Sequence, residues 1–584
     1  MRSIDTLLED CIGNGRYQAA IISLVLLVGI PAAFMQTATV FIAALPDARC
    51  WIEALDNDTA SDVLSEDVIK STLIPYDEIA QRYDRCHMFN YNLTGCEGNL
   101  NISQCVDDAT NSTSPNIGDC QDGHYFNKDI FESTVATEWD LLCGRLTLKS
   151  GSTSVFYFGV FAGSIIGGAL SDRFGRILIY KIGLLAGLVV GIAVAFSPNY
   201  HVFSLLRFLL ALLYKPASLA AVVYALEVSR ERWKTTAALG YNIIYGLGCV
   251  IMSGLAIFWR NWRPLQIAFS LGFLPLVLTS FFLPESPRWL VSKEKFAEAD
   301  KTLKLMRKRN HAKGVVDLNT ERDLAPVAAD KREVNNKDGN SLIETFSRPY
   351  SRMMTINNMF VWMITSLVYY GISLNSGALA GNIYVNHALG GAMDIIAISL
   401  CIVAISKFGC RNCTVMTLVL CGLSCLLSTV ALHVGAGVTA IKYVGLVLAM
   451  SGRFGSSAAF AVLFVHTVEL FPTSGRNTAL GLASMAARIG SIITPFTLQI
   501  QYQVPWLTQA IFGFTALAAA CVAYSFPETK DNSLLMTFNE TEKYFEKNLR
   551  SSKMATIYCI SGKRDRDPDE ASVDEEDAPT NEKL

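Results

Sequence analysis

The chain has 584 residues, of which 51% are hydrophobic and only 17% are charged, and its mean hydropathy is +0.32. This composition excludes an ordinary soluble globular protein and indicates a membrane protein. The formal net charge of -3 argues against a nucleic-acid partner.

The chain begins with a polar, acidic stretch, residues 1–16, which lacks the basic flank of a signal peptide. The first apolar run covers residues 17–44 and is longer than the roughly 20 residues that a membrane span needs. We therefore expect a first membrane helix that is retained, with the amino terminus in the cytoplasm.

Residues 46–147 form a polar segment rich in cysteines and in Asn-x-Ser/Thr glycosylation sites. Because both features are typical of the oxidising side of a membrane, we expect a small extracellular domain with up to three disulfides in one of fifteen pairings. Zinc binding is the alternative, although paired Cys-x-x-Cys spacings are missing. The cysteines are Cys50, Cys86, Cys96, Cys105, Cys120 and Cys143, and the glycosylation sites are Asn57, Asn92, Asn101 and Asn111.

Eleven further apolar runs follow this segment. Twelve spans would place both termini in the cytoplasm, and the basic residues of the predicted inner turns agree with the positive-inside rule. One predicted outer turn departs from the rule because it contains Arg260 and Arg263. The further spans are expected at about residues 149–170, 177–196, 201–226, 236–258, 262–283, 353–375, 382–406, 413–432, 438–467, 477–501 and 504–525.

A short charged turn, residues 168–177, lies between the second and third predicted spans. Asp172, Arg173 and Arg176 are too costly to place unpaired in hydrocarbon, so the turn is predicted at a membrane face. Within it, Gly168-Ala-Leu-Ser-Asp-Arg-Phe-Gly175-Arg resembles the loop signature between helices 2 and 3 of the major facilitator superfamily. The basic turn is also explained in part by the positive-inside rule alone.

Similar short motifs recur about 240 residues apart and indicate an internal repeat. Glu227 and Lys234 match Glu469 and Arg476, and both pairs follow a long apolar run. Three further matches are Pro284-Glu285 with Pro527-Glu528, residues 172–175 with the less similar residues 406–409, and Arg207 with Arg453. We expect Arg207 and Arg453 to open the fourth and tenth helices. The prediction is an all-α membrane protein with six-helix halves at residues 17–283 and 353–525, a cytoplasmic linker at 284–352 and a mostly disordered tail at 526–584. Such halves are the architecture that the superfamily resemblance implies.

Charges at the inner ends of the spans form a candidate gate. If the halves rock, these carboxylates and bases can pair when the inner side is closed and separate when it opens. Static anchoring of the topology is the alternative explanation. The candidate gating residues are Gly168, Asp172, Arg173, Gly175, Arg176, Glu227, Lys234, Glu285, Arg288, Arg453, Glu469, Arg476 and Glu528.

Several further stretches resemble one branch of the superfamily, the organic cation, anion and carnitine transporter family. They are residues 133–143, 284–290 and 468–473, and residues 370–375 with 381–386 are most similar to the carnitine-type members. The resemblance implies facilitated or ion-coupled movement of small organic ions across the plasma membrane.

The charge of the central cavity distinguishes the cargo classes. Arg488 lies in the middle of the eleventh predicted span, where a guanidinium must face water, a carboxylate or substrate. The resemblance implies an aspartate at this position in cation carriers and an arginine in anion and carnitine carriers. Lys215 adds a second cation, whereas structural pairing of Arg488 with Asp394 is the alternative.

We therefore expect a carrier of zwitterions or organic anions that works by alternating access. The aromatic residues Tyr245, Trp362, Tyr369 and Tyr370 could hold the cationic part of a zwitterion by cation–π contact, although ordinary packing explains them equally well. An organic cation carrier is the first alternative, and a channel or a non-transporting receptor is the second. Motifs for enzymatic, cofactor or metal chemistry are missing from the sequence, and the coupling ion and oligomeric state are left open.

Overall fold

The computed structural model of the chain describes residues 15–52, 56, 66–78, 82–91, 116–120, 122–230, 233–310, 341–379, 381–434, 439–472, 475–529 and 542. The predicted glycosylation sites Asn57, Asn92, Asn101 and Asn111 lie outside these residues. So do Cys96 and Cys105, and the third predicted disulfide lies with them outside the described part of the chain.

The first half contains six spans. The first span consists of three consecutive helices, and the sixth is divided between α13 and α14 because Gly272 ends one helix and Pro275 stands in the first turn of the next. The helices are α2 Arg16–Leu26, α3 Gly29–Thr37, α4 Thr39–Ile42, α9 Leu146–Phe174, α10 Arg176–Ala195, α11 Tyr200–Val228, α12 Lys234–Phe258, α13 Trp262–Leu271 and α14 Leu274–Ser280.

The second half follows a linker whose described residues contain α15, α16 and α18. Asn382 caps α20 because its side chain accepts a hydrogen bond from the backbone N–H of Tyr384, 2.8 Å away. The linker helices are α15 Pro287–Ser292, α16 Phe296–Asn310 and α18 Ser341–Ser347. The spans of the half are α19 Pro349–Leu374, α20 Ile383–Phe408, α21 Cys410–Val434, α22 Thr439–Leu470, α23 Arg476–Ile500 and α24 Leu507–Tyr524.

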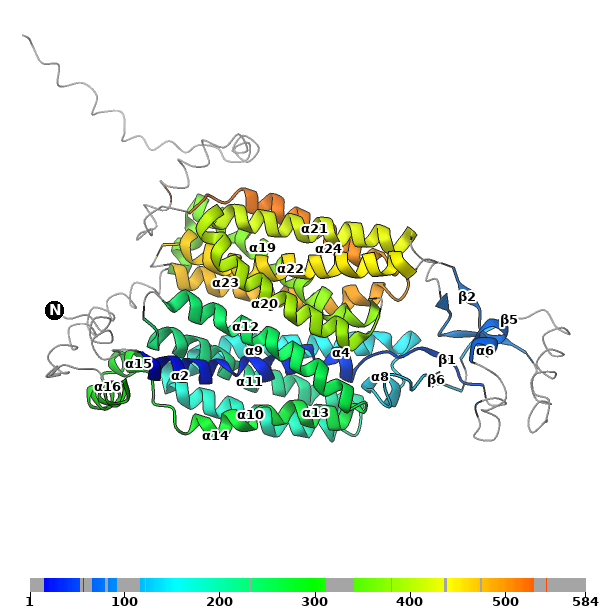
Figure 1. Cartoon of the computed structure of the whole chain (residues 1–584), viewed down its shortest axis with the longest axis horizontal. Helices are drawn as coiled ribbons and strands as arrows, with labels where there is room; N and C mark the ends of the chain where they lie inside the picture. Colours follow the sequence, from blue (N-terminus) through cyan, green and yellow to red (C-terminus); the bar gives the residue numbers. More distant parts are fainter. Residues whose placement is uncertain are drawn as a thin grey trace, which may run out of the picture.

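The two halves form separate bodies of one bundle (Figure 1), with the blue-to-green helices in one layer and the yellow-green-to-orange helices in the other. Each half has its own large cluster of buried apolar side chains. Ten helices of the described residues are long and apolar enough to cross a membrane. The other two predicted spans are the divided helix α13 with α14, and α19. This architecture confirms the predicted two-half helical fold.

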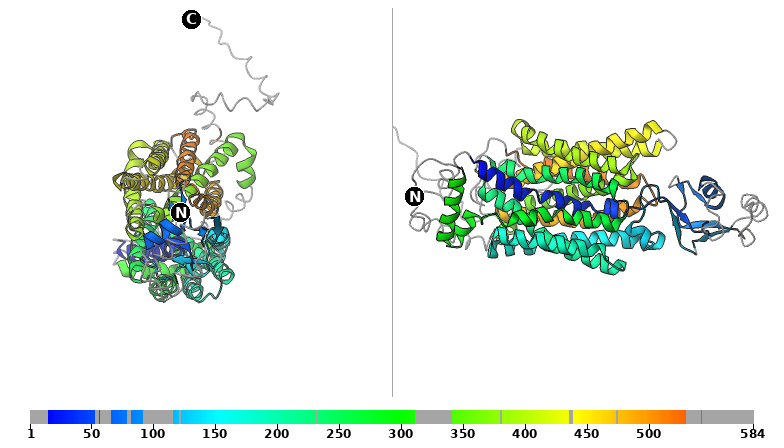
Figure 2. Two further views of the ribbon diagram at one scale, coloured as in Figure 1. Left: turned by 90° about the vertical axis from the view of Figure 1, so that its right-hand side faces the viewer. Right: turned by 60° about the horizontal axis from the view of Figure 1, so that its bottom comes forward.

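The described residues between α4 and α9 form a small domain at one end of the bundle, which we call the outer end (Figure 2). Its strands pair in three antiparallel two-stranded sheets, β1 with β6, β2 with β3 and β4 with β5. Disulfides join Cys50 to Cys120 and Cys86 to Cys143, as part of the predicted framework. The elements are β1 Ala48–Cys50, α6 Glu66–Leu73, β2 Tyr76–Asp77, β3 Arg82–Tyr83, β4 His87–Asn90, β5 Asn116–Asp119, β6 His124–Phe126 and α8 Val135–Glu138.

The same turn occurs at the inner end of both halves, the end that carries α15 and α16. Gly175 lies between α9 and α10 with a φ of 112°, and Gly409 lies between α20 and α21 with a φ of 81°. A glutamate follows the last helix of each half and reaches back to this turn: Glu285 accepts hydrogen bonds from the backbone of α10, and Glu528 from that of α21. The two halves therefore share not only the predicted sequence repeat but also the hydrogen bonds from a glutamate to this turn.

Two basic residues of an outer turn, Arg260 and Arg263, break the positive-inside pattern, and the outer domain accounts for both. Arg260 donates hydrogen bonds to the carbonyls of Lys128 and Ile130. Arg263 forms an ion pair with Glu138 of α8. These charges therefore fasten the outer domain onto the first half.

Candidate functional site

A cavity of about 100 Å³ lies between the two halves near the middle of the bundle. Both halves contribute to its walls, and its lining mixes charged groups, amides and tyrosine rings. The lining residues are Gln36, Lys215, Tyr241, Asn242, Tyr245, Tyr369, Tyr370, Asp394, Ile398, Ser457, Phe460, Ala461 and Arg488. We call this space the central cavity.

Arg488 reaches the central cavity from the middle of α23. Its Nη1 lies 3.5 Å from the hydroxyl of Tyr370, and that hydroxyl donates to Oε1 of Gln36 at 2.8 Å. The buried Nε of Arg488 has no hydrogen-bond partner among the described residues, and no described carboxylate lies within ion-pair distance of this guanidinium. Arg488 is therefore a positive charge directed at the cavity without a counter-charge from the described part of the chain.

Asp394 already has a different partner. Nε of Arg453 donates to Oδ1 of Asp394 at 2.9 Å, and the two side chains are 4% and 1% exposed. The hydroxyl of Tyr369 donates to the same carboxylate at 3.1 Å, and the guanidinium of Arg453 lies over the Tyr369 ring. The alternative in which Asp394 pairs with Arg488 is therefore wrong in this structure.

Arg453 corrects a second expectation. It lies near the middle of α22 instead of at its beginning, and it is buried beside the central cavity. The predicted position came from the match of Arg453 with Arg207 in the repeat, although the apolar run of the tenth span was expected to start at residue 438. Arg207 is likewise buried inside α11 and does not open that helix. The residue therefore belongs with Asp394 and not with the inner-face charges.

Lys215 lines the central cavity from α11 and is 5% exposed. Since Arg453 neutralises Asp394, Lys215 and Arg488 leave the lining with an excess of positive charge. A buried excess of positive charge favours an anionic group in the cavity.

The predicted aromatic residues divide into two groups. Tyr245, Tyr369 and Tyr370 line the central cavity, but Trp362 does not. The Trp362 Nε1–H donates to Oγ1 of Thr467 at 3.0 Å, and its ring packs on Phe460 inside the second half. Trp362 is therefore a packing residue, as the alternative explanation of these rings proposed.

Sequence reasoning missed several lining residues, including Gln36, Tyr241, Asn242 and Ser457. Gln36 had a usable signal because it is an amide inside the first apolar run. The others had none, because small polar residues and tyrosines are common on membrane helices that pack against one another.

At the inner end, four of the predicted gating residues of the first half, Asp172, Arg176, Glu227 and Glu285, bond within that half. Arg176 binds Asp172 one turn away and Glu227 of α11, with Nη2 of Arg176 3.0 Å from Oε1 of Glu227. Glu285 accepts from the backbone N–H of Arg176 at 3.0 Å, and Trp289 donates to the carbonyl of Asp172. This network holds α9, α10, α11 and the linker together.

The second half has bonds of the same kind. Glu528 accepts from the backbone N–H groups of Arg411 and Asn412, and Oγ1 of Thr529 donates to Glu469. The other candidate residues lie near these groups in the chain: Gly168 and Arg173 near the end of α9, Lys234 and Arg476 at the first residues of α12 and α23, and Arg288 in α15.

Contacts at the outer end join the two halves. Tyr157 of α9 packs on Tyr370 of α19 with ring centroids 5.1 Å apart. The hydroxyl of Ser154 donates to the carbonyl of Ile492 at 2.7 Å. Together with the bond between Gln36 and Tyr370, these contacts close the central cavity toward the outer domain.

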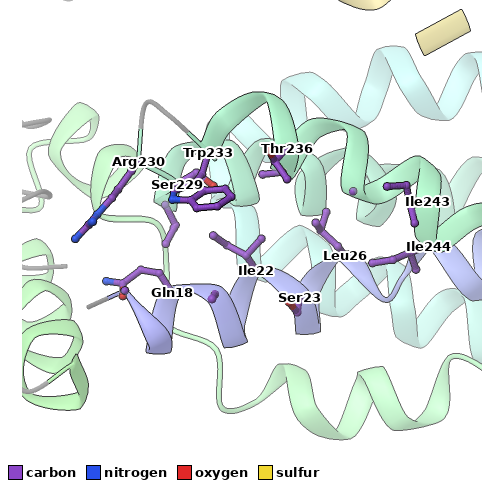
Figure 3. Close-up of a pocket in the computed structure, with 15 residues that line it drawn as sticks. Gln18, Ile22, Ser23, Leu26, Ser229, Arg230, Trp233, Thr236, Ile243 and Ile244 are labelled. Atoms are coloured by element: carbon purple, nitrogen blue, oxygen red, sulfur yellow. The ribbon is translucent and has the colours of Figure 1, made fainter. Parts of the chain in front are cut away.

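A larger cavity of about 530 Å³ lies at the inner end between α2, α12 and the end of α11 (Figure 3). Ile22, Leu26, Ile243 and Ile244 make its walls largely aliphatic, and Arg230 lies at its inner end. Its walls come from the first half alone. Because a site for a charged ion needs converging polar groups, the smaller central cavity is the better candidate.

Comparison with known proteins identifies relatives over most of the chain. The model of the sugar (and other) transporter family matches residues 88–540. The chain is 30% identical over 543 residues to solute carrier family 22 member 21 of Mus musculus, covering 92% of this chain and 93% of the relative. It is 31% identical over 516 residues to solute carrier family 22 member 12 of Mus musculus, covering 86% and 89%. The organic cation transporter-like protein of Drosophila melanogaster is 29% identical over 563 residues, covering 95% and 94%.

Solved structures share the fold. The proton:xylose symporter XylE bound to 6-bromo-6-deoxy-D-glucose superposes with a TM-score of 0.53 at 16% identity, covering 69% of this chain and 90% of that one. The inward open conformation of the xylose transporter XylE from E. coli gives a TM-score of 0.53 at 14% identity, covering 90% and 99%. These likenesses show the major facilitator fold.

Proposed function

This chain belongs to solute carrier family 22, within the sugar (and other) transporter family, and we propose that the organic ion it carries bears a carboxylate or a similar anionic group. Membership makes it a multi-pass secondary transporter of small organic ions and not an enzyme. The charge class of the cargo is the proposal.

The single observation that carries the proposal is that the Arg488 guanidinium has no counter-charge among the described residues. Its guanidinium faces the central cavity and makes one long contact, to Tyr370, whereas the Asp394 carboxylate is matched by Arg453. An arginine binds a carboxylate through two parallel hydrogen bonds, and a water-poor cavity strengthens that interaction. A carboxylate on the substrate would therefore supply a counter-charge that none of the described residues provides.

A zwitterion of the carnitine type is the form of this cargo that the cavity supports best. The tyrosines Tyr245, Tyr369 and Tyr370 line the same space as Arg488. A quaternary ammonium on their ring faces gains about 0.5–2 kcal/mol from cation–π contact, depending on desolvation. Arg488 would hold the carboxylate while the rings hold the cation, and a simple monovalent anion would use Arg488 and Lys215.

An organic cation is the second candidate cargo. Asp394 lines the cavity, and one relative is named an organic cation transporter-like protein. To bind a cation directly, Asp394 would have to leave Arg453, which would strand a buried guanidinium at a cost of several kcal/mol. Because of this cost, an organic cation is a less favoured cargo than an organic anion.

The small size of the central cavity supports transport by alternating access. Its volume of about 100 Å³ is below the roughly 300–1,000 Å³ of typical ligand sites. We therefore propose that substrate enters when the halves move apart, with the bonded inner charges keeping each half rigid during the motion. The outer domain then faces the cell exterior, both termini face the cytoplasm, and the protein acts in the plasma membrane.

Parallel uptake measurements test the charge class. Cells expressing the protein take up labelled carnitine, a monovalent organic anion and a quaternary ammonium, each with wild type, Arg488→Asp and Arg488→Lys. We expect uptake of carnitine or the anion, a fall of at least about tenfold with Arg488→Asp, and a smaller fall with Arg488→Lys, which keeps the charge. Surface biotinylation normalises each rate to the protein present.

Two results would contradict the proposal. Vigorous uptake of the quaternary ammonium alone, unaffected by Arg488→Asp, would assign the cargo to cations. Uptake that is not accelerated by unlabelled substrate on the opposite side would indicate a channel, since a carrier exchanges its cargo across the membrane and a channel does not.

A further inference from the structure

A second polar cavity lies directly outside the closed outer end. Its volume is about 490 Å³, and its walls come from the outer domain, from the outer ends of α4 and α19, and from the turn before α24. We call this space the vestibule. Its charged lining residues are Arg82, Arg85, Lys149, Asp47 and Asp129.

One layer of side chains separates the vestibule from the central cavity. Gln36 lines the central cavity and Thr39 lines the vestibule, less than one helical turn further along the same span. On α19, Tyr370 lines the central cavity and Leu374 lines the vestibule, about one turn apart. An ion in the vestibule therefore has only the contact layer around Gln36 and Tyr370 left to pass.

Tyr502, in the turn before α24, positions two of the three vestibule cations. Nη2 of Arg82 donates to the Tyr502 carbonyl at 2.6 Å, and Nζ of Lys149 lies 3.1 Å from its hydroxyl. These bonds use one donor each, whereas a guanidinium has five N–H donors and an ammonium has three. Both groups are held in place by bonds to neutral oxygens, which do not neutralise their charges.

Arg85 is the third cation, and it is incompletely satisfied. Its Nη2 lies 3.7 Å from Asp47, whose other oxygen is bound by Lys70 at 2.5 Å. The buried Nε of Arg85 has no hydrogen-bond partner among the described residues. Burial, followed by the charge of Arg85, lowers the pKa of Arg82, and the smaller opposing effects of Asp77 and Asp47 do not offset them.

Asp47 and Asp129 do not cancel this charge. Asp47 is engaged by Lys70 at the edge of the vestibule, and Asp129 is exposed. Three basic side chains from the outer domain and from α9 therefore share one cavity with one exposed and one occupied carboxylate. Clustered arginines that keep unused N–H donors are suited to bind carboxylates.

We infer that the vestibule is an outer loading site for small organic anions, in which Arg82, Arg85 and Lys149 bind the substrate carboxylate before the halves open. The inference rests on the proposed function for the identity of the ligand. The vestibule itself is tested separately, through its effect on anionic reagents that are not transported.

The first experiment measures uptake kinetics of a monovalent organic anion with Arg85→Gln, Lys149→Gln and Arg145→Gln. Arg145 is the matched control because it is exposed at the outer end and does not line the vestibule. We expect Arg85→Gln and Lys149→Gln to raise KM about three- to tenfold with an unchanged maximal rate per surface molecule, and Arg145→Gln to leave KM unchanged. A fall in maximal rate without a rise in KM would overturn the inference, because it would assign these residues to conformational change through Tyr502.

The second experiment does not depend on transport. The Lys149→Cys variant is labelled from outside with an anionic and a cationic methanethiosulfonate reagent, alone and combined with Arg85→Gln. We expect the anionic reagent to react several-fold faster than the cationic one, and Arg85→Gln to reduce that ratio. Ile117→Cys, at a side chain that is 60% exposed in the outer domain, provides a control ratio that Arg85→Gln does not change. If the ratio of anionic to cationic labelling rates at Lys149→Cys is near one and does not change with Arg85→Gln, the vestibule is not an anion site.

The two experiments separate the two ideas. If the anionic reagent labels Lys149→Cys faster than the cationic one but the wild type takes up no organic anion, the proposed cargo is wrong and the vestibule remains an anion site. Anion uptake that depends on Arg488 but not on Arg85 or Lys149 would keep the cargo and overturn the loading site.

Discussion

Arg453 donates through Nε to Asp394 at 2.9 Å, and the two side chains are almost completely withdrawn from solvent between α20 and α22. Removing one partner of a buried ion pair strands the other charge, which typically costs about 3–5 kcal/mol. The pair therefore determines both the stability of the second half and the charge that remains for the substrate.

The first prediction concerns this pair. Asp394→Asn and Arg453→Gln should each lower the thermal unfolding temperature of the purified protein and its level at the cell surface, because each leaves one buried charge alone. The double variant should be more stable than either single variant, since it strands no charge. Strict additivity of the two losses would contradict the pairing.

The second prediction concerns the glycine turn at Gly175. An added Cβ would lie 2.6 Å from the Glu285 carboxylate, and the φ of 112° is strained for any other residue. Gly175→Ala should therefore destabilise the protein by about 1–2 kcal/mol or more and reduce transport. Gly168→Ala is the control because a Cβ there meets open space on α9. Equal unfolding temperatures for the two variants would show that the turn carries no strain.

The third prediction concerns pH. Burial raises the pKa of Glu285 above its usual value, against the lowering effect of hydrogen bonds from the backbone of Ser286, Ile177 and Arg176. The folded state therefore binds this proton more tightly than the unfolded state. The resulting stabilisation is fully present below the ordinary glutamate pKa and is lost as the pH rises through the raised pKa.

Glu285→Gln should remove that contribution. The difference in unfolding temperature between wild type and Glu285→Gln, measured in detergent as a function of pH, should change across the interval from the ordinary to the raised pKa and be flat above it. A difference that is constant throughout would show that Glu285 does not titrate differently on folding.

The fourth prediction concerns the disulfides of the outer domain. The Cys50–Cys120 and Cys86–Cys143 bonds span 70 and 57 residues, and closing loops of this size contributes about 4 kcal/mol in the chain-entropy model. Replacing Cys50 and Cys120 together by serine should lower surface expression and the unfolding temperature. Cys521→Ser is the control, because that thiol is free and exposed. Unchanged expression of the double variant would show that the bond is dispensable for folding.

The two-half architecture could be predicted because the repeat and the hydropathy can be read directly from the amino-acid sequence, without knowledge of tertiary contacts. Positions such as Glu285 and Glu528 recur at matching places in the two halves, and the structure assigns both to the same kind of turn. The division of the sixth span could not be predicted from hydropathy, which is continuous across Gly272 and Pro275.

The cavity could be predicted only in part. Arg488, Lys215 and three tyrosines were found because charges and rings are conspicuous on membrane helices. The partner of Asp394 could not be found, because two arginines of the second half were available and the choice depends on the rotation of α22 and α23 about their axes. Trp362 was misplaced for the same reason, since one helix carries both cavity-facing and core-facing aromatic residues.

The carboxylates of Glu285 and Glu528 also constrain how the protein is synthesised. Each follows the last helix of its half and bonds to backbone groups more than one hundred residues earlier in the chain, Glu285 to Arg176 and Glu528 to Arg411. A ribosome must therefore release a complete set of six helices before the third helix of that set gains its stabilising contact. Each half should mature as a unit after its last helix enters the membrane, and chains that stop before either glutamate should be retained by quality control.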